Sequence, residues 1–385
     1  MGNQLYNKPF FINARVAVAA FFFISGLSFA SWATRIPYLQ AQLHLSEAQL
    51  GSLLLALPIG SMLSLPLSGW LVAKVGSRLS LMVAATTYPL VLTMIGFAHS
   101  ATQLASLLVL FGLVGNYFNI AVNTQAVLVE KLYAKPIMAG FHGVWSLAGF
   151  LGGALGSLFI LLQASVWVHF GCVMLFAWLI AVYMYPFTQT GSPIASTTTQ
   201  PIFAKPDKQL LYLGIVAFCC MTCEGTMFDW SGVYFKKVVH APTSLIALGY
   251  VAFMSTMALG RFLGDGFTAK IGIQKMLQLS GATIMLGLLL AVFFPNVPMA
   301  TIGFLLVGGG VSSVVPLVYS TAGKSKRMQP GAALAAVSSI GFIGFLIGPP
   351  MIGFIAQQAG LRYSFALIAL LGLGTSIVAT LNKRW

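Results

Sequence analysis

Charged side chains are scarce in this 385-residue sequence, in which Asp, Glu, Lys and Arg together make up 7% of the residues. Soluble globular domains carry about 25% of such residues, so a soluble protein of this length could not cover its surface with them. Acidic residues are the scarcest, with six Asp and Glu against twenty Lys and Arg, whereas 58% of the chain is hydrophobic. The composition therefore excludes an ordinary soluble domain and predicts that lipid surrounds most of the exterior.

Cysteine is also scarce, and three of the four cysteines lie in one hydrophobic stretch: Cys219, Cys220 and Cys223. A zinc or redox site would need further ligands nearby, so we interpret these thiols as packing residues. The sequence has no Gly-x-x-x-x-Gly-Lys loop, which argues against ATP as a driving force. Its basic residues form no run with interleaved aromatics, which argues against nucleic acid. We expect no enzyme activity, no catalytic residue, no metal and no cofactor.

Long apolar runs are what the sequence has in abundance. Runs of about 20 residues are long enough to cross a bilayer as helices. We place twelve such spans at residues 14–37, 47–73, 79–98, 102–128, 137–161, 165–187, 209–235, 244–268, 275–294, 298–322, 331–356 and 362–381.

Lys and Arg are distributed unevenly between the two ends of these spans. Fifteen lie on the side of the N-terminus, against four on the other side. The positive-inside rule then predicts a bacterial inner-membrane protein with both termini in the cytoplasm. The longest polar stretch, 188–208, is rich in Ser, Thr and Pro and falls at mid-chain. It predicts a cytoplasmic linker between six-helix bundles at 1–187 and 209–385.

A pattern of small residues in the fifth span returns in the eleventh. Ser146, Gly149, Phe150, Gly152 and Gly156 recur, each 192 residues later, as Ser338, Gly341, Phe342, Gly344 and Gly348. Small residues three or four apart form a groove that a neighbouring helix can approach closely. The repeat predicts an all-α membrane fold of two six-helix bundles related by pseudo-two-fold symmetry.

Two loops carry a more specific pattern. The first runs from Gly69 to Arg78, and the second is Gly260-Arg261-Phe262-Leu263-Gly264-Asp265 followed by Lys270, Gly272 and Lys275. Both resemble the signature loop of the major facilitator superfamily, although Ala73 replaces the Asp of the first. The resemblance implies a monomeric transporter that works by alternating access. It also implies that Arg78, Arg261 and Asp265 belong to the gating loops that hold the two halves together.

Shorter stretches resemble the sugar:proton symporter branch that includes fucose permease: Trp32–Pro37, Asn119–Asn123, Phe141–Gly143 and Glu224–Ser231. The resemblance implies proton-coupled symport of a sugar-like solute, so that the partners are a small solute, protons and the bilayer. Similar sequences have Asp where this chain has Asn119, which removes one candidate proton carrier.

A competing signature, typical of proton antiporters, is a glycine-rich fifth helix with a Gly-Pro step. Gly140, Gly149 and Gly153 have the antiporter spacing, but Ala154 replaces the proline. That replacement favours symport or uniport, and the alternative function is a proton-coupled exporter of amphipathic small molecules.

Two acids lie deep in the seventh span. Glu224 is near its centre, and a carboxyl group there can bind and release a proton, so we expect it to carry the coupled proton. Asp229 is five residues further on, which is about 140° around a helix. A straight helix would point the two acids apart and leave one of them structural, whereas a break at Gly225 or Gly232 would bring them together. Asp229 is the second proton-coupling candidate, and Arg35 is a candidate partner for it.

Polar residues also form stripes inside other spans. Asn116, Asn119 and Asn123 lie at i, i+3 and i+7, and three amides facing lipid would be expensive, so we expect them to border the solute route. Trp32 and Arg35 share one face of the first span, where they either contact solute or anchor the helix at the interface. In the tenth span Ser312 and Tyr319 complete the predicted solute-binding set. A run of three glycines, Gly308 to Gly310, and Pro316 predict a bendable gate there.

Glu130 and His142 lie at corresponding ends of the fourth and fifth spans. We expect them to be neighbours at the inner gate. Histidine titrates near physiological pH, so a proton relay is an alternative to a structural pair.

Overall fold

The computed structural model describes residues 8–133, 137–190, 207–325, 328 and 330–382, and within these ranges the regular structure is helical. The first half contains α1 Lys8–Gln42, α2 Glu47–Leu54, α3 Ala56–Val75, α4 Ser77–Ile95, α5 Ala101–Glu130, α6 Met138–Leu161, α7 Val166–Met184 and the 3-10 turn η1 Tyr185–Phe187. The second half contains α8 Lys208–Lys237, the 3-10 turn η2 Thr243–Leu245, α9 Leu248–Ile271, α10 Ile273–Phe293, α11 Val297–Val311, α12 Val314–Ala322, α13 Pro330–Ala359 and α14 Leu361–Leu381.

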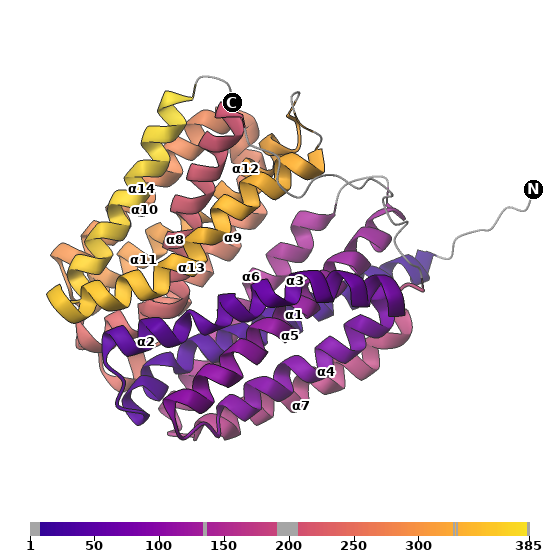
Figure 1. The fold of residues 1–385 in the computed structure, drawn as a ribbon, viewed down its shortest axis with the longest axis horizontal. Helices are drawn as coiled ribbons and strands as arrows, with labels where there is room; N and C mark the ends of the chain where they lie inside the picture. The colour runs from indigo at the N-terminus through magenta and orange to yellow at the C-terminus, as the bar shows by residue number, and fades with distance from the viewer. Residues whose placement is uncertain (1–7, 134–136, 191–206, 326–327, 329, 383–385) are drawn as a thin grey trace, which may run out of the picture. The chain divides into compact units, whose positions relative to one another are not determined.

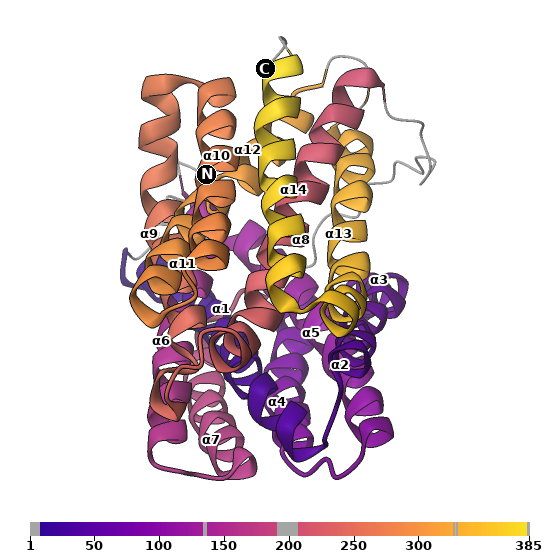
Figure 2. The ribbon, with the colours of Figure 1, turned by 90° about the vertical axis from the view of Figure 1, so that its left-hand side faces the viewer.

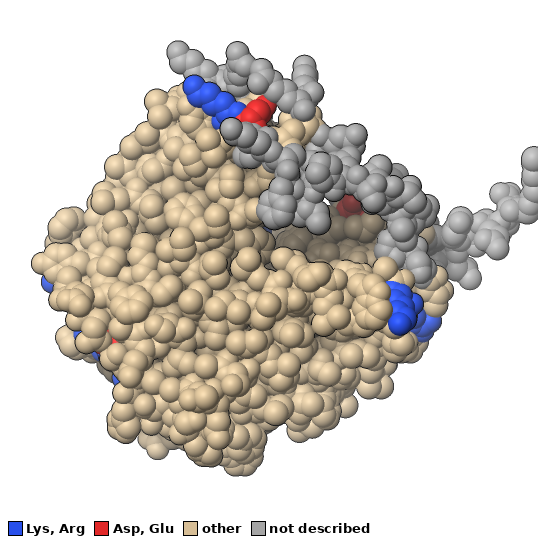
Figure 3. Space-filling view, viewed as in Figure 1, with Lys and Arg blue, Asp and Glu red and all other residues tan. Residues whose placement is uncertain are grey.

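Twelve stretches of helix in the described residues are long and apolar enough to cross a membrane, which confirms the predicted number. The second stretch, Glu47–Val75, contains α2 and α3, and the tenth, Val297–Ala322, contains α11 and α12. Leu55 separates the first pair of helices, and Ser312 and Ser313 separate the second. The face drawn in Figure 3 is covered almost entirely by uncharged residues, with Lys, Arg, Asp and Glu near its margins. This distribution is the one expected for a surface in contact with lipid.

The helices divide into two compact units, drawn in Figures 1 and 2. The first unit comprises residues 1–32 and 56–196, and the second comprises 33–55 and 197–385. Within the first unit α3 and α4 both pack on α5, and α4 also packs on α7. Within the second unit α10 packs between α11 and α14, and α8 packs on α13. Most of the predicted linker, 188–208, lies outside the described residues.

The repeated small residues hold equivalent helix contacts in the two units. Gly152 of α6 lies against Ala30 and Leu27 of α1, and Gly344 of α13, 192 residues later, lies against Thr222 and Phe218 of α8. A side chain at either glycine would collide with the neighbouring helix. The repeat seen in the sequence therefore corresponds to a repeat in packing.

The two signature loops also have the same backbone. Gly76, between α3 and α4, has φ of 84°, and Gly272, between α9 and α10, has φ of 82°. A positive φ is strained for residues that carry a Cβ. Glycine is therefore required at the matching position of both loops.

The surroundings of two glycines in α3 predict that replacing each with alanine will change stability by different amounts. A Cβ at Gly60 would overlap the backbone carbonyl of Val109 in α5, whereas one at Gly69 would meet nothing within 4 Å. We expect Gly60→Ala to cost about 1–3 kcal/mol, because two helix backbones must separate. Gly69→Ala should be neutral or stabilising by up to about 1 kcal/mol. Apparent melting temperatures of the two purified variants test this, and equal values would contradict the packing.

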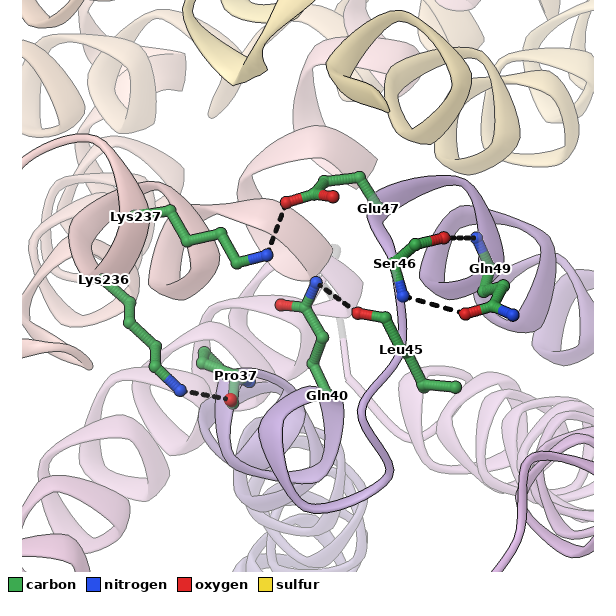
Figure 4. A network of polar contacts seen from close by, with 8 residues as sticks. All are labelled: Pro37, Gln40, Leu45, Ser46, Glu47, Gln49, Lys236 and Lys237. Carbon is green, nitrogen blue, oxygen red and sulfur yellow. Dashed lines mark hydrogen bonds and ion pairs between the residues drawn. The ribbon is translucent and has the colours of Figure 1, made fainter. Parts of the chain in front are cut away.

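Residues 33–55, the ends of the first two spans, pack with helices of the second unit. Figure 4 shows Lys237 of α8 paired with Glu47 of α2, and Lys236 donating to the carbonyl of Pro37 at 3.1 Å. Ser46 caps α2 through a reciprocal pair of hydrogen bonds with Gln49, at 2.9 and 3.2 Å. Deeper in this contact, Gly51 of α2 lies against the backbone of α13.

The Lys237–Glu47 ion pair should contribute little to stability. Its side chains are 38% and 23% exposed, and ion pairs of this kind contribute about 0–1 kcal/mol. We expect Lys237→Gln to lower the apparent melting temperature slightly at low salt and not at all at high salt. A drop as large as that of Gly60→Ala at both salt concentrations would show that the pair is not merely a surface contact.

Candidate functional site

Glu224 and Arg261 form an ion pair inside the second unit. Nη2 of Arg261, from α9, donates to Oε1 of Glu224, from α8, at 3.2 Å. The side chains are 16% and 9% exposed, respectively. Two opposite charges placed side by side at this depth remove most of the cost of burying either one alone.

Three helices supply the surroundings of this pair. Cys220 lies one turn before Glu224 on α8, and its thiol points at the carbonyl of Val311, 3.9 Å away. The hydroxyl of Tyr319, from α12, lies 4.0 Å from the sulfur of Met221. Both Cys220 and Tyr319 are close enough to interact electrostatically with Glu224. The carboxylate therefore has one cation and otherwise weakly polar neighbours.

The tenth span is interrupted beside this pair. Ser312 and Ser313 separate α11 from α12, and Pro316 offers no N–H to the carbonyl four residues earlier. The hydroxyls of Ser312 and Ser313 lie against Gly260 and Gly264 of α9, where a Cβ would collide with them. Ser312 donates to the carbonyl of Gly309 at 2.7 Å. The interruption occurs where the glycine run and the proline predicted a bend, and its role as a gate stays a prediction.

The packing of α9 against the interrupted span also positions Arg261. This residue lies between Gly260 and Gly264 in sequence, so the two glycines that bring α9 against the interrupted span also position the backbone of Arg261. The charge pair and the helix interruption thus share one helix–helix contact.

Asp229 does not join Glu224, because α8 is unbroken from Lys208 to Lys237. Gly225 and Gly232 allow close packing rather than a break: Gly225 lies against Phe345 of α13, and Gly232 lies against Pro37. The two acids therefore point to different faces, as a straight helix requires. Arg35 is not the ion-pair partner of Asp229 either, since the ion pairs among the described residues are Lys237–Glu47 and Arg261–Glu224.

Trp32 and Arg35 are both buried in α1, each 1% exposed. The indole Nε1 of Trp32 has no hydrogen-bond partner in the described part of the chain. The guanidinium of Arg35 lies 5.9 Å from the ring centre of Tyr38. Neither residue lies at the surface of the helix bundle, which disfavours the alternative of interfacial anchors.

The asparagine row on α5 is only partly covered. Asn119 is exposed, and Asn116 and Asn123 are half-buried. Nδ2 of Asn123 donates to the carbonyl of Asn119 at 2.8 Å, whereas Nδ2 of Asn116 has no partner among the described residues. The exposed amide of Asn119 is therefore the one on this face that is accessible to a polar molecule.

Glu130 and His142 were expected to be neighbours at the inner gate, and the structure places Glu130 at the start of α6, the helix that carries His142. Oε2 of Glu130 accepts hydrogen bonds from the backbone N–H groups of Ile137 and Met138, both at 2.8 Å, and so caps the start of α6. The exposed ring of His142 lies 5.3 Å from that of Phe22. An acid at a helix N-terminus is stabilised by the free N–H groups there, so Glu130 ties the end of α5 to the start of α6.

The remaining predicted gating residues lie at helix ends. The guanidinium of Arg78 stacks over the ring of Tyr185 at 4.7 Å, which joins the start of α4 to the end of α7. Asp265 is exposed on α9. Arg261, predicted to act with them, lies inside the eighth span and pairs with Glu224 of the seventh.

The Glu224–Arg261 contact was missed from the sequence, although one signal pointed to it. Arg261 lies inside a hydrophobic span, and a cation there needs a counter-charge. Glu224, in the preceding span, is the acid near a span centre. The signature-loop resemblance gave Arg261 a gating role, so no counter-charge for it was sought in the other spans.

No group of three or more His, Cys, Asp and Glu side chains within the described ranges is arranged to hold a metal ion. Cys219, Cys220 and Cys223 are buried free thiols.

Comparison with known proteins agrees with this architecture. The family model of the Major Facilitator Superfamily matches residues 17–330. An uncharacterized MFS-type transporter of Yersinia pestis is 34% identical over 375 residues, covering 97% of both chains. The membrane protein MosC of Rhizobium meliloti is 32% identical over 361 residues, covering 93% of this chain and 87% of MosC.

Solved structures show the same fold at low identity. A bacterial homologue of the human lysosomal transporter Spinster, in an inward-facing and occupied conformation, has a TM-score of 0.75 and 16% identity, covering 97% of each chain. The nucleoside transporter NupG has a TM-score of 0.75 and 11% identity, covering 97% of this chain and all of that one. The chain therefore belongs to the major facilitator superfamily and is a multi-pass membrane transporter, not an enzyme.

Proposed function

We propose that this chain is a secondary active transporter that moves a small, polar, sugar-like solute together with protons by alternating access. We place it as a monomer in the bacterial inner membrane with both termini in the cytoplasm. The observation that carries the proposal is the buried ion pair of Glu224 and Arg261. Within the superfamily, we assign the chain to the sugar:proton symporter branch that includes fucose permease.

The pair supports proton coupling because only one of its members can lose its charge. A glutamate becomes neutral by taking up a proton, whereas the arginine guanidinium stays charged. Protonation of Glu224 would therefore release Arg261 from its partner. Since Arg261 is seated by glycines that contact Ser312 and Ser313, its release acts on the interrupted tenth span. We infer that this sequence couples proton binding to reorientation.

The polar residues support a hydroxylated solute. Asn116, Asn119 and Asn123 offer amide donors and acceptors, and Tyr319 and Ser312 offer hydroxyl groups. Trp32 is an indole with an unused N–H donor, and an aromatic face packs well on the apolar face of a sugar ring. We propose these residues as the solute-binding set, with Arg35 binding an oxygen-rich group.

A flux assay in proteoliposomes tests the proposal. A thermal-shift screen with hexoses, pentoses and nucleosides first identifies a solute that stabilises the purified protein. That solute is then added outside liposomes that contain a pH-sensitive dye and no initial gradient. Symport predicts acidification of the lumen as the solute enters. Alkalinisation would instead support exchange, as in a proton-coupled exporter, and solute entry without any proton movement would overturn the coupling.

A further inference from the structure

Asp229 has an unusual place on α8. Every residue from Cys219 to Phe235 is buried except Asp229, which is partly exposed. The one group that this stretch of helix offers to a molecule from outside the bundle is thus a carboxylate.

This carboxylate has no partner within the described part of the chain. It takes part in neither of the ion pairs there, since Glu224 is occupied by Arg261, and Glu47 by Lys237. Lys236, seven residues on and on the same face of α8, donates to the carbonyl of Pro37; at 1.5 Å per residue it lies about 10 Å along the helix from Asp229. An ionised carboxylate at membrane depth without a counter-ion costs several kcal/mol, and either a proton or a cation from outside the chain removes that cost.

The glycines on either side of Asp229 show which side chains lie nearby. Gly225, one turn earlier on the same face, lies against the ring of Phe345 from α13. Gly232, almost one turn later, lies against Pro37. Asp229 therefore lies between an aromatic ring and a proline of the first span. Phe345 thus places an aromatic ring near the helix turn before Asp229, and an alkylammonium group bound to the carboxylate could also contact that ring.

We propose that Asp229 binds a protonated amine of the transported solute, so that the solute is a small polar amine such as an amino sugar or an amino alcohol. This inference rests on the proposed transport function and narrows its solute class. It divides the work of the two acids in α8: Glu224, held by Arg261, binds the coupled proton, and Asp229 binds the cationic nitrogen of the solute. Neutralising Asp229 with the solute's own charge also removes the cost of moving either charge alone.

Matched pairs of compounds test the proposal on the purified, detergent-solubilised full chain. The pairs are glucosamine and glucose, galactosamine and galactose, glucamine and sorbitol, and ethanolamine and ethylene glycol. At equal concentration and neutral pH, at least one amine should raise the apparent melting temperature while its hydroxyl counterpart does not. Equal shifts within every pair, or no shift with any amine, would overturn the proposal.

Three variants assign the effect to Asp229. Asp229→Asn should fold like the wild type and weaken the amine response by at least about tenfold, because a charge-assisted contact is lost. Asp229→Glu, which keeps the charge, should retain the preference for amines over hydroxyl compounds. Asp207→Asn, the same substitution at the N-cap of the same helix, should respond like the wild type. An unchanged amine response in Asp229→Asn would overturn the assignment.

The binding assay uses no proton gradient, so its failure is separate from that of the coupling mechanism. Amine binding that depends on Asp229, in a protein that moves no protons with its solute, would refute the coupling and leave this inference standing. Proton-coupled entry of a neutral sugar, with no amine response, would do the reverse.

Discussion

We expect Glu224→Gln to lower the apparent melting temperature more than the other polar substitutions, Arg261→Gln and Lys237→Gln. The variant leaves the guanidinium of Arg261, whose side chain is only 16% exposed, without its anion. Arginine cannot shed its charge, and removing one partner of a buried ion pair costs about 3–5 kcal/mol. Thermal unfolding of the purified variant, followed by tryptophan fluorescence, measures the effect.

The reciprocal variant separates charge from packing. Arg261→Gln strands a carboxyl group that can take up a proton, so its cost should be smaller than that of Glu224→Gln and should shrink further at acidic pH. The double variant, Glu224→Gln with Arg261→Gln, leaves two neutral amides and should recover much of the loss. Additive losses in the double variant would contradict an energetic link between the two side chains. Lys237→Gln, from an exposed pair, is the control for a generic charge effect.

The same double variant should uncouple transport from protons. With amides at 224 and 261 there is no group at this position that binds and releases a proton, so we expect solute-driven proton movement to fall by at least about tenfold. Such a loss corresponds to about 1.4 kcal/mol or more of coupling. The dye-loaded proteoliposomes described above measure it, while exchange of labelled solute across the membrane at equal pH on both sides should continue.

A charge-removing variant outside the pair serves as the control for the proton-movement assay. Lys237→Gln lies outside the pair and should keep normal proton movement. If the double variant moved as many protons per solute as the wild type, another group would carry the proton, and Asp229 would be the first to examine. If the double variant neither exchanged solute nor moved protons despite normal folding, the pair would be needed for the transport cycle itself rather than for its coupling.

The spans and their repeat were predictable because each depends on short-range pattern. Runs of about 20 apolar residues define the spans, and the glycines at 76 and 272 mark loops where only a positive φ closes the turn. The interruption of the tenth span was also foreseeable, since Gly308 to Gly310 and Pro316 are local signals. Such features need no knowledge of which helix touches which.

Contacts between helices were less predictable. The pairing of Glu224 with Arg261 depends on how α8 and α9 are rotated toward each other, which no local pattern states. Arg35 was named as a candidate partner for Asp229, and the structure instead gives Asp229 no partner in the described residues. Glu130 was assigned to a gate with His142, and the sequence did not reveal that its oxygen accepts hydrogen bonds from the N–H groups at the start of α6.

The central claim is that polar residues inside the membrane spans border water rather than lipid, and cysteine accessibility tests it most directly. Asn119→Cys on α5 and Leu175→Cys on α7, both exposed positions within spans, are made in a background without the four native cysteines. A thiolate adds to the double bond of a maleimide, and the thiolate forms readily only in water. We expect a membrane-impermeant maleimide to label position 119 in native membrane vesicles at least about ten times faster than position 175. Equal, slow labelling at both positions would mean that the asparagine row faces lipid and would contradict it.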